Sequence, residues 1–174
     1  FLTKMGTVLG KEYRKDYSLI CGDRWGEKAS WKDRKRNLTE KTSSRWAGSI
    51  TQQSHTDISM GLRNLQAERK DLKVRIKTIK ERLAIPEGSA KVYKKGKRTI
   101  QPYRQGVEYF QKTRRLAVLE DRLLGVETRI SEQHPKIVFG GGKLWTNKQN
   151  LNKAKLSPNE WERVWNSKRM FLKA

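Results

Sequence analysis

The sequence predicts a mixed α+β fold, in which a helical lobe with a long antiparallel helical hairpin precedes part of a small β-rich domain. Apolar residues recur at helical spacing along two long stretches, which is typical of paired amphipathic helices. A glycine-rich run flanked by β-branched and aromatic residues favours a strand–turn–strand unit. A serine, a proline and a glutamate near the end of the chain indicate the start of a short helix.

Residues 1–41 form a basic segment without a clear hydrophobic period. Trp25 and Trp31 lie among lysines and arginines, and Gly22 and Gly26 interrupt any long helix. Two interpretations stay open for this segment. It is either a solvated, partly helical stretch or a stretch that contacts nucleic acid.

The helical lobe is predicted for residues 42–134, and two apolar stripes define its helices. The first stripe has heptad-like spacing and consists of Ile58, Leu62, Leu65, Leu72, Ile76, Ile79 and Leu83. It predicts a long helix near residues 43–84, which Pro86 and Gly88 end. The second stripe consists of Tyr109, Leu116, Leu119, Leu123, Val126 and Ile130. It predicts a helix near residues 107–133, and two such helices joined by a loop pack antiparallel.

The connector between these helices, residues 86–106, is strongly basic. Its cations and the tyrosines between them are Lys91, Tyr93, Lys94, Lys95, Lys97, Arg98, Tyr103 and Arg104. Ammonium and guanidinium groups neutralise phosphates while rings stack on bases, so this pattern predicts a clamp on a nucleic-acid backbone. The alternative is a solvated loop that becomes ordered only on bound nucleic acid.

The β-rich part is predicted for residues 135–174. Ile137, Val138 and Phe139 enter three glycines, and Leu144 and Trp145 follow, so strands are expected near residues 136–146 around a tight turn. Residues 170–172 are expected to begin another strand.

A short helix is predicted within this part, over residues 158–168. Ser157 is a suitable N-cap, Pro158 suits the first helical position, and Glu160 completes a capping box. We expect Trp145 to be a core residue that packs on Trp161 or Trp165, with base or sugar stacking as the alternative.

The charge of the chain predicts a polyanionic partner. Its 174 residues include 40 lysines and arginines against 18 aspartates and glutamates, a formal net charge of +22. Nucleic acid is the usual counter-charge for such a chain. An anionic membrane surface is the main other candidate, but no amphipathic basic helix with an apolar Leu/Phe face stands out, so no membrane partner is predicted. No apolar run approaches the roughly 18 to 20 residues of a membrane-spanning helix either.

No catalytic or metal-binding residue is predicted in this sequence. The single cysteine, Cys21, excludes a disulfide framework and a multi-cysteine zinc site. Two histidines are too few for a metal site, and no nucleophile elbow, phosphate loop or HExxH motif occurs. Because the chain opens on Phe1 rather than methionine, we expect it to be a piece of a longer polypeptide.

Two stretches resemble one protein family. The runs "IVFGGGKLW…QNL" and "EWERVW…R" look like the TnpB family of transposon-encoded RNA-guided nucleases, relatives of the type V CRISPR effectors. Residues 43–83, "SSRWAGSITQQSHTDISMGLRNLQAERKDLKVRIKTIKERL", resemble the recognition-lobe helices of the same family. The resemblance covers these residues and residues 110–174, whereas residues 1–41 and the connector match poorly.

The resemblance implies the recognition and wedge portion of an RNA-guided DNA-targeting effector in a bacterial or archaeal cytoplasm. Its partners would be guide RNA, target DNA paired with that RNA, and the remainder of the parent polypeptide. The family cuts DNA with a RuvC-type domain that holds two magnesium ions. That domain follows the wedge region in the family, so Mg²⁺ is expected there and no cofactor is expected in these residues.

The residues expected to contact nucleic acid come from the first long helix, the connector and the glycine-rich run. They are Arg45, Trp46, Arg63, Lys91, Tyr93, Lys94, Lys95, Lys97, Arg98, Tyr103, Arg104, Lys143 and Lys148. Alternative functions remain open: a structural RNA-binding protein of the ribosome-associated kind, and a relative of the effectors that binds DNA without cutting it. A regulator with a helix in the major groove would need a shorter turn than this connector.

Overall fold

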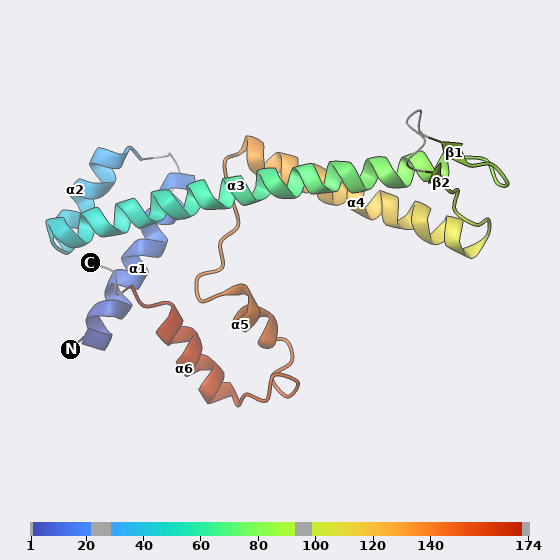
Figure 1. The fold of residues 1–174 in the computed structure, drawn as a ribbon. Helices are drawn as coiled ribbons and strands as arrows, with labels where there is room; N and C mark the ends of the chain where they lie inside the picture. Colours follow the sequence, from blue (N-terminus) through green and yellow to red (C-terminus); the bar gives the residue numbers. More distant parts are fainter. Residues whose placement is uncertain (1, 22–28, 93–98, 172–174) are drawn as a thin grey trace. The chain divides into compact units, whose positions relative to one another are not determined.

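The structure is a computed structural model that describes residues 2–21, 29–92 and 99–171 (Figure 1). It is mainly helical with a small antiparallel sheet, so the α+β class is confirmed at this coarse level. The described elements are α1 (Leu2–Cys21), α2 (Trp31–Lys41), α3 (Ser44–Leu83), β1 (Lys91–Val92), β2 (Thr99–Ile100), α4 (Val107–Ser131), α5 (Gly142–Asn147) and α6 (Pro158–Lys168).

Two compact units divide the chain. One consists of residues 1–61 and 135–174, and the other of residues 62–134. The first boundary lies inside α3 and therefore differs from the boundary expected at residue 42. The start of α3 packs with α1 and α2, whereas its second half packs with α4, so one continuous helix contributes to both units.

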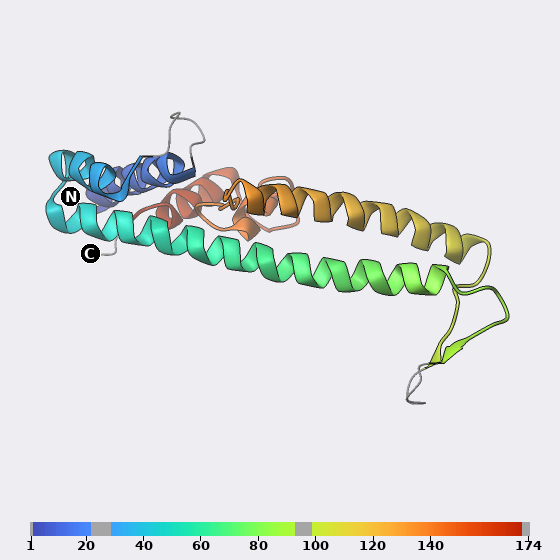
Figure 2. The same cartoon turned by 90° about the horizontal axis from the view of Figure 1, so that it is seen from above.

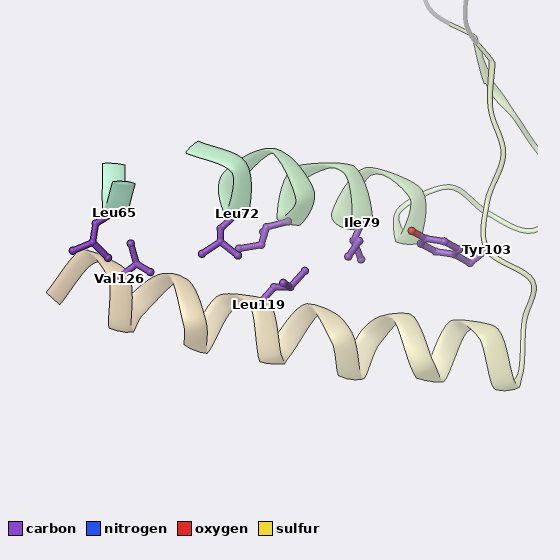
Figure 3. Close-up of a cluster of buried hydrophobic side chains, with 7 residues drawn as sticks. Leu65, Leu72, Ile79, Tyr103, Leu119 and Val126 are labelled. Carbon is purple, nitrogen blue, oxygen red and sulfur yellow. The ribbon is translucent and has the colours of Figure 1, made fainter. Parts of the chain in front are cut away.

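The helical hairpin is present where the sequence predicted it. The second half of α3 and the whole of α4 lie side by side, and the apolar stripes of both helices meet between them (Figure 2). Figure 3 shows Leu65, Leu72 and Ile79 of α3 pointing toward Leu119 and Val126 of α4. Burial of such side chains stabilises the unit by about 1.5–3 kcal/mol each relative to exposure.

Charged pairs flank this apolar seam. Three ion pairs join the helices: Lys80 with Glu120 at 2.7 Å, Lys73 with Glu127 at 2.8 Å, and Arg122 with Glu68 at 2.5 Å. Solvent-exposed pairs of this kind contribute about 0–1 kcal/mol each. Their main effect is to favour one register between α3 and α4.

The connector contains the only strands among the described residues. Lys91 pairs with Ile100, and Val92 pairs with Thr99, in antiparallel register. Further along, Tyr103 is buried in the hairpin core, and the guanidinium carbon of Arg82 lies 3.8 Å from the centre of its ring. A segment predicted as a loop therefore closes the end of the hairpin.

The other unit has its own core, which residues 1–41 help to build. Its buried and half-buried apolar side chains come from α1, α2, the start of α3 and Phe171, and they are Met5, Leu9, Tyr13, Leu38, Trp46, Ala47, Ile50 and Phe171. The described part of the segment that the sequence left open therefore consists mostly of two helices, which add apolar side chains to this core. The glycines at residues 22 and 26 fall between these helices and lie outside the described residues.

The strand–turn–strand prediction for residues 136–146 is wrong. Ile137, Val138 and Phe139 form no strand, and Leu144 and Trp145 belong to helix α5. Phe139 packs edge-on against Tyr13 and Tyr17 of α1 instead, with ring centres 5.2 and 5.4 Å apart. These β-forming residues are held by side-chain packing on helices, because the unit offers no strand to pair with among its described residues.

The expected strand at residues 170–172 is also absent from the part of the chain that the structure describes. The backbone N–H of Phe171 donates to the carbonyl of Gly6 at 3.0 Å, and its ring packs near Tyr13 and Trp46. This single backbone hydrogen bond to a helix does not make residues 170 and 171 a β-strand, which would need paired hydrogen bonds to a neighbouring strand. The small β-rich domain is therefore not observed, although the helix inside it is.

Helix α6 begins and ends where the sequence predicted. Ser157 accepts from the backbone N–H of Glu160, and Glu160 accepts from the backbone N–H of Ser157, which completes the capping box. These hydrogen bonds hold the pKa of the Glu160 carboxyl below its usual range.

Leu72→Ala is predicted to lower the free energy of unfolding by about 2–5 kcal/mol, because Leu72 is buried in the hairpin core. Val74→Ala is the matched control, since Val74 is largely exposed on the same helix; its effect should stay within about 0.5 kcal/mol. Urea denaturation followed by circular dichroism measures both. Equal losses in the two variants would contradict the assignment of the core.

Candidate nucleic-acid interface

The connector supplies fewer described contact residues than its sequence predicts. Lys91 and Arg104 are exposed, as a phosphate contact requires. Tyr103 is buried against Arg82, so its ring is a core residue and is not available for stacking on a base. The remaining predicted residues of the connector, Tyr93, Lys94, Lys95, Lys97 and Arg98, lie outside the described residues.

Helix α3 places its three predicted residues differently. Arg45 and Arg63 are exposed, whereas Trp46 is half-buried and its ring centre lies 6.2 Å from that of Phe171. Trp46 therefore serves mainly the core of its unit. The sequence could not separate this role from stacking, because a tryptophan beside an arginine suits both.

A cluster of three tryptophans lies where α5 meets α6. Trp161 and Trp165 stack with ring centres 5.2 Å apart, and Trp145 packs at a tilt 6.0 Å from Trp165. The indole N–H of Trp161 donates to the carbonyl of Leu144 at 2.8 Å. This bond and the stacking fix the short helix α5 on α6.

The prediction that Trp145 packs on Trp165 is confirmed, but Trp145 is not a core residue. It is 49% exposed, whereas Trp161 is only 8% exposed. The ammonium nitrogen of Lys148 lies 5.8 Å from the Trp145 ring and 5.4 Å from the Trp161 ring. Lys148 thus borders the partly exposed Trp145 ring, which combines stacking surface with positive charge, and Lys143 is exposed on the same short helix α5.

Gly140 permits this arrangement. Its φ of +104° is unfavourable for other residues, and an added Cβ would lie 2.8 Å from the ring of Trp165. The glycine-rich run therefore does not form a hairpin turn. It lets the backbone pass close to the tryptophan cluster and enter α5.

Helix α2 carries a second basic and aromatic face, in the segment for which the sequence left nucleic-acid contact open without naming a site residue. An open groove there is lined by Trp31, Lys32, Lys35, Arg36 and Thr39, which recur at helical spacing. Trp31 is partly exposed and meets the ring of His55 edge-on. The signal was present as the spacing of these residues, but it became readable only once a helix was known to begin at Trp31.

A buried ion pair holds this face in place. One guanidinium nitrogen of Arg34 on α2 lies 3.0 Å from each carboxylate oxygen of Asp16 on α1, and both side chains are almost fully buried. Burial raises the pKa of the Asp16 carboxyl, and the charge of Arg34 acts in the opposite direction. The polar side chain of Ser54 also lowers the pKa of this carboxyl, and the ion pair joins α2 to α1 inside the unit.

The described residues do not fit a metal centre or a membrane span. Among them, no three histidine, cysteine, aspartate or glutamate side chains lie close enough together to hold a metal ion. Several carboxylates of α3 and α4 are instead in ion pairs with lysines or arginines. No described helix has the length and apolar character that crossing a membrane requires.

In comparisons with known proteins, no family model, curated protein or solved structure matches this chain.

Asp16→Ala is predicted to destabilise the unit that contains α1 and α2 by about 3–5 kcal/mol, because it leaves the Arg34 charge buried without its partner. The double variant Asp16→Ala/Arg34→Met should recover most of this loss, since it removes the orphaned charge and keeps an apolar stem. Thermal melting of both variants tests this. A double variant as unstable as Asp16→Ala would contradict the buried pair.

Trp161→Ala is predicted to cost about 3–5 kcal/mol, because it removes a buried ring and its hydrogen bond to Leu144. Trp145→Ala should cost clearly less, since half of that ring is exposed. Denaturation of the two variants gives the comparison. A larger loss for Trp145→Ala would show that the more exposed ring is the structural one.

Proposed function

We propose that this chain binds guide RNA and the hybrid of that RNA with target DNA, as the recognition and wedge portion of an RNA-guided DNA-targeting effector. The resemblance of residues 43–83 and 110–174 to the TnpB-like and type V family supports this assignment. Within that portion, the chain's task is to hold nucleic acid, and no catalytic step is assigned to it.

The observation that carries the proposal is the pairing of exposed tryptophans with cations on outward faces. Trp31 lies in one groove with Lys32, Lys35 and Arg36, and Trp145 lies beside Lys148. An aromatic face that a base can stack on contributes about 1–3 kcal/mol per base, and each neighbouring cation neutralises a phosphate. A solvated charged surface would not need to expose these rings.

Contacts of this kind recognise the sugar-phosphate backbone and the shape of the nucleic acid rather than its base sequence. In RNA-guided recognition, base pairing between guide and target supplies the specificity, while the protein holds the duplex by its phosphates and A-form geometry. A net charge of +22 without a base-reading motif suits that division. Nuclease chemistry with Mg²⁺, which the family performs, is assigned to the remainder of the parent polypeptide.

A structural RNA-binding protein is the alternative that the same charge favours. It would bind folded RNA and gain nothing from a DNA strand paired to it. Titration with one RNA, alone and as a hybrid with complementary DNA, separates the two functions. We expect the chain to bind the hybrid at least as tightly as the RNA, and both more tightly than random duplex DNA.

Changing Lys32, Lys35 and Arg36 together to alanine is predicted to weaken binding to an RNA–DNA hybrid. The slope of log affinity against log salt should fall by about one unit for each lost phosphate contact. Fluorescence anisotropy between about 50 and 200 mM salt measures this, a range over which the unchanged chain should lose about 10³-fold or more in affinity. The melting temperature should change little, because these side chains point into an open groove.

The matched control removes three exposed cations elsewhere, as in Lys70→Ala/Lys77→Ala/Arg115→Ala on α3 and α4. It lowers the net charge by the same amount. An equal loss of affinity and slope in this control would show that binding is spread over the whole charged surface. In that case α2 would not be a site.

A further inference from the structure

Helix α4 has a second apolar face that the hairpin does not use. Val107, Phe110, Val118 and Leu124 are each between 61% and 73% exposed. Single exposed apolar residues are ordinary, but several large ones on the same side of one helix indicate an interaction surface.

The residues on this side of α4 have heptad-like spacing of their own. The outward positions that recur in steps of three and four are Val107, Phe110, Arg114, Ala117, Asp121, Leu124 and Thr128, with Val118 and Gly125 beside them. Residues at this spacing lie on one side of a helix. The buried residues Leu119 and Val126, and the residues paired with α3, lie on the other side.

We propose that this outward face pairs with α4 of a second copy of the chain, antiparallel and with a two-fold axis between Ala117 and Val118. In such a pair, a residue that lies a given number of positions before the axis faces the residue of the second copy that lies the same number of positions after it. Arg114 then faces Asp121 of the second copy, and Asp121 faces its Arg114, so two opposite charges meet twice.

The sizes of the side chains match in the same register. Phe110 faces Gly125 of the second copy, and an added Cβ at Gly125 would meet no atom within 4 Å, so the space above this glycine is open. Val107 faces Thr128, and Ala117 faces Val118, so small and large side chains alternate across the pair.

The charges on this face also favour the antiparallel orientation of the two helices, and they favour a second copy of the chain over nucleic acid. A parallel pair would place Arg114 on Arg114 and Asp121 on Asp121, and like charges at contact repel. Nucleic acid does not suit this face, because its exposed surface is mostly apolar and its one aspartate would repel phosphate. Among the residues that the structure describes, neither Arg114 nor Asp121 has an ion-pair partner within its own chain.

The dimer is expected to be reversible. One helix of 25 residues is about 37 Å long, and a contact along it buries less than most stable interfaces. Two chains of charge +22 also repel each other, so pairing should be measured where salt screens that repulsion.

Sedimentation velocity of the 174-residue chain at about 0.3 M salt tests the proposal. The unchanged chain should dimerise as its concentration rises. Arg114→Asp and Asp121→Arg should each weaken dimerisation at least tenfold, because each puts like charges together. The double variant Arg114→Asp/Asp121→Arg should restore it, because the exchanged charges again meet their opposites. Lys70→Glu on α3 changes the net charge as Arg114→Asp does and should leave dimerisation intact.

Disulfide trapping in a Cys21→Ser background tests the orientation. Val118→Cys lies next to the two-fold axis and should cross-link under oxidation, whereas Thr128→Cys faces Val107 and should not. Circular dichroism of each variant shows whether it is folded, and only folded variants are compared. A chain that stays monomeric at every concentration, a dimer that the single reversals leave unchanged, or cross-linking at residue 128 instead of 118 would each overturn the proposal.

Discussion

The apolar seam along α3 is the interaction on which the rest of the structure depends. Its second half buries leucines and isoleucines against α4, and its first turns bury Ala47 and Ile50 against α1 and α2. Few other apolar residues are available, since only 34% of the chain is hydrophobic. A chain with so much positive charge remains folded because this seam removes enough apolar surface from water to offset the repulsion.

The same constraint explains where the charges lie. Lysines and arginines outnumber their acidic partners and cannot enter the narrow cores unpaired. Asp16 and Arg34 enter together and position α2. Many other cations of the described residues are exposed, and two tryptophans, Trp31 and Trp145, are exposed beside such cations. The proposed binding surface is therefore a consequence of how the cores are built, with α2 and α5 acting as the rigid supports.

The sequence predicted three of the helices well, α3, α4 and α6, but it did not predict α1, α2, α5 or the two short strands. Stripes of Leu and Ile over many turns predicted α3 and α4 nearly to the residue, and the capping box of Ser157 and Glu160 predicted α6. The run from Ile137 to Phe139 was wrongly predicted as a strand, because β-branched and aromatic residues also pack well in an extended segment that lies against helices. Its partners, Tyr13 and Tyr17, lie more than a hundred residues away, and no local pattern reveals such a contact.

The sequence predicted the class of partner for the candidate interface, but it predicted the individual contact residues less well. The charge of the chain indicated a polyanionic partner, and Lys148 does lie beside the exposed ring of Trp145. Tyr103 and Trp46 have the residue types of a stacking site, yet both are needed for cores. Nucleic-acid contact was left open for residues 1–41, but no residue of α2 was named as a site, because its cations recur at helical spacing only if a helix begins at Trp31.

Cross-linking of the bound nucleic acid tests the central claim most directly. Ultraviolet irradiation of the chain with an RNA–DNA hybrid, followed by mass spectrometry, identifies the peptides that touch the strands. Peptides carrying Trp31 and Trp145 are predicted among the cross-linked products, because their rings are exposed beside cations. Cross-links confined to other segments, or none with the hybrid while duplex DNA cross-links readily, would contradict the proposed function.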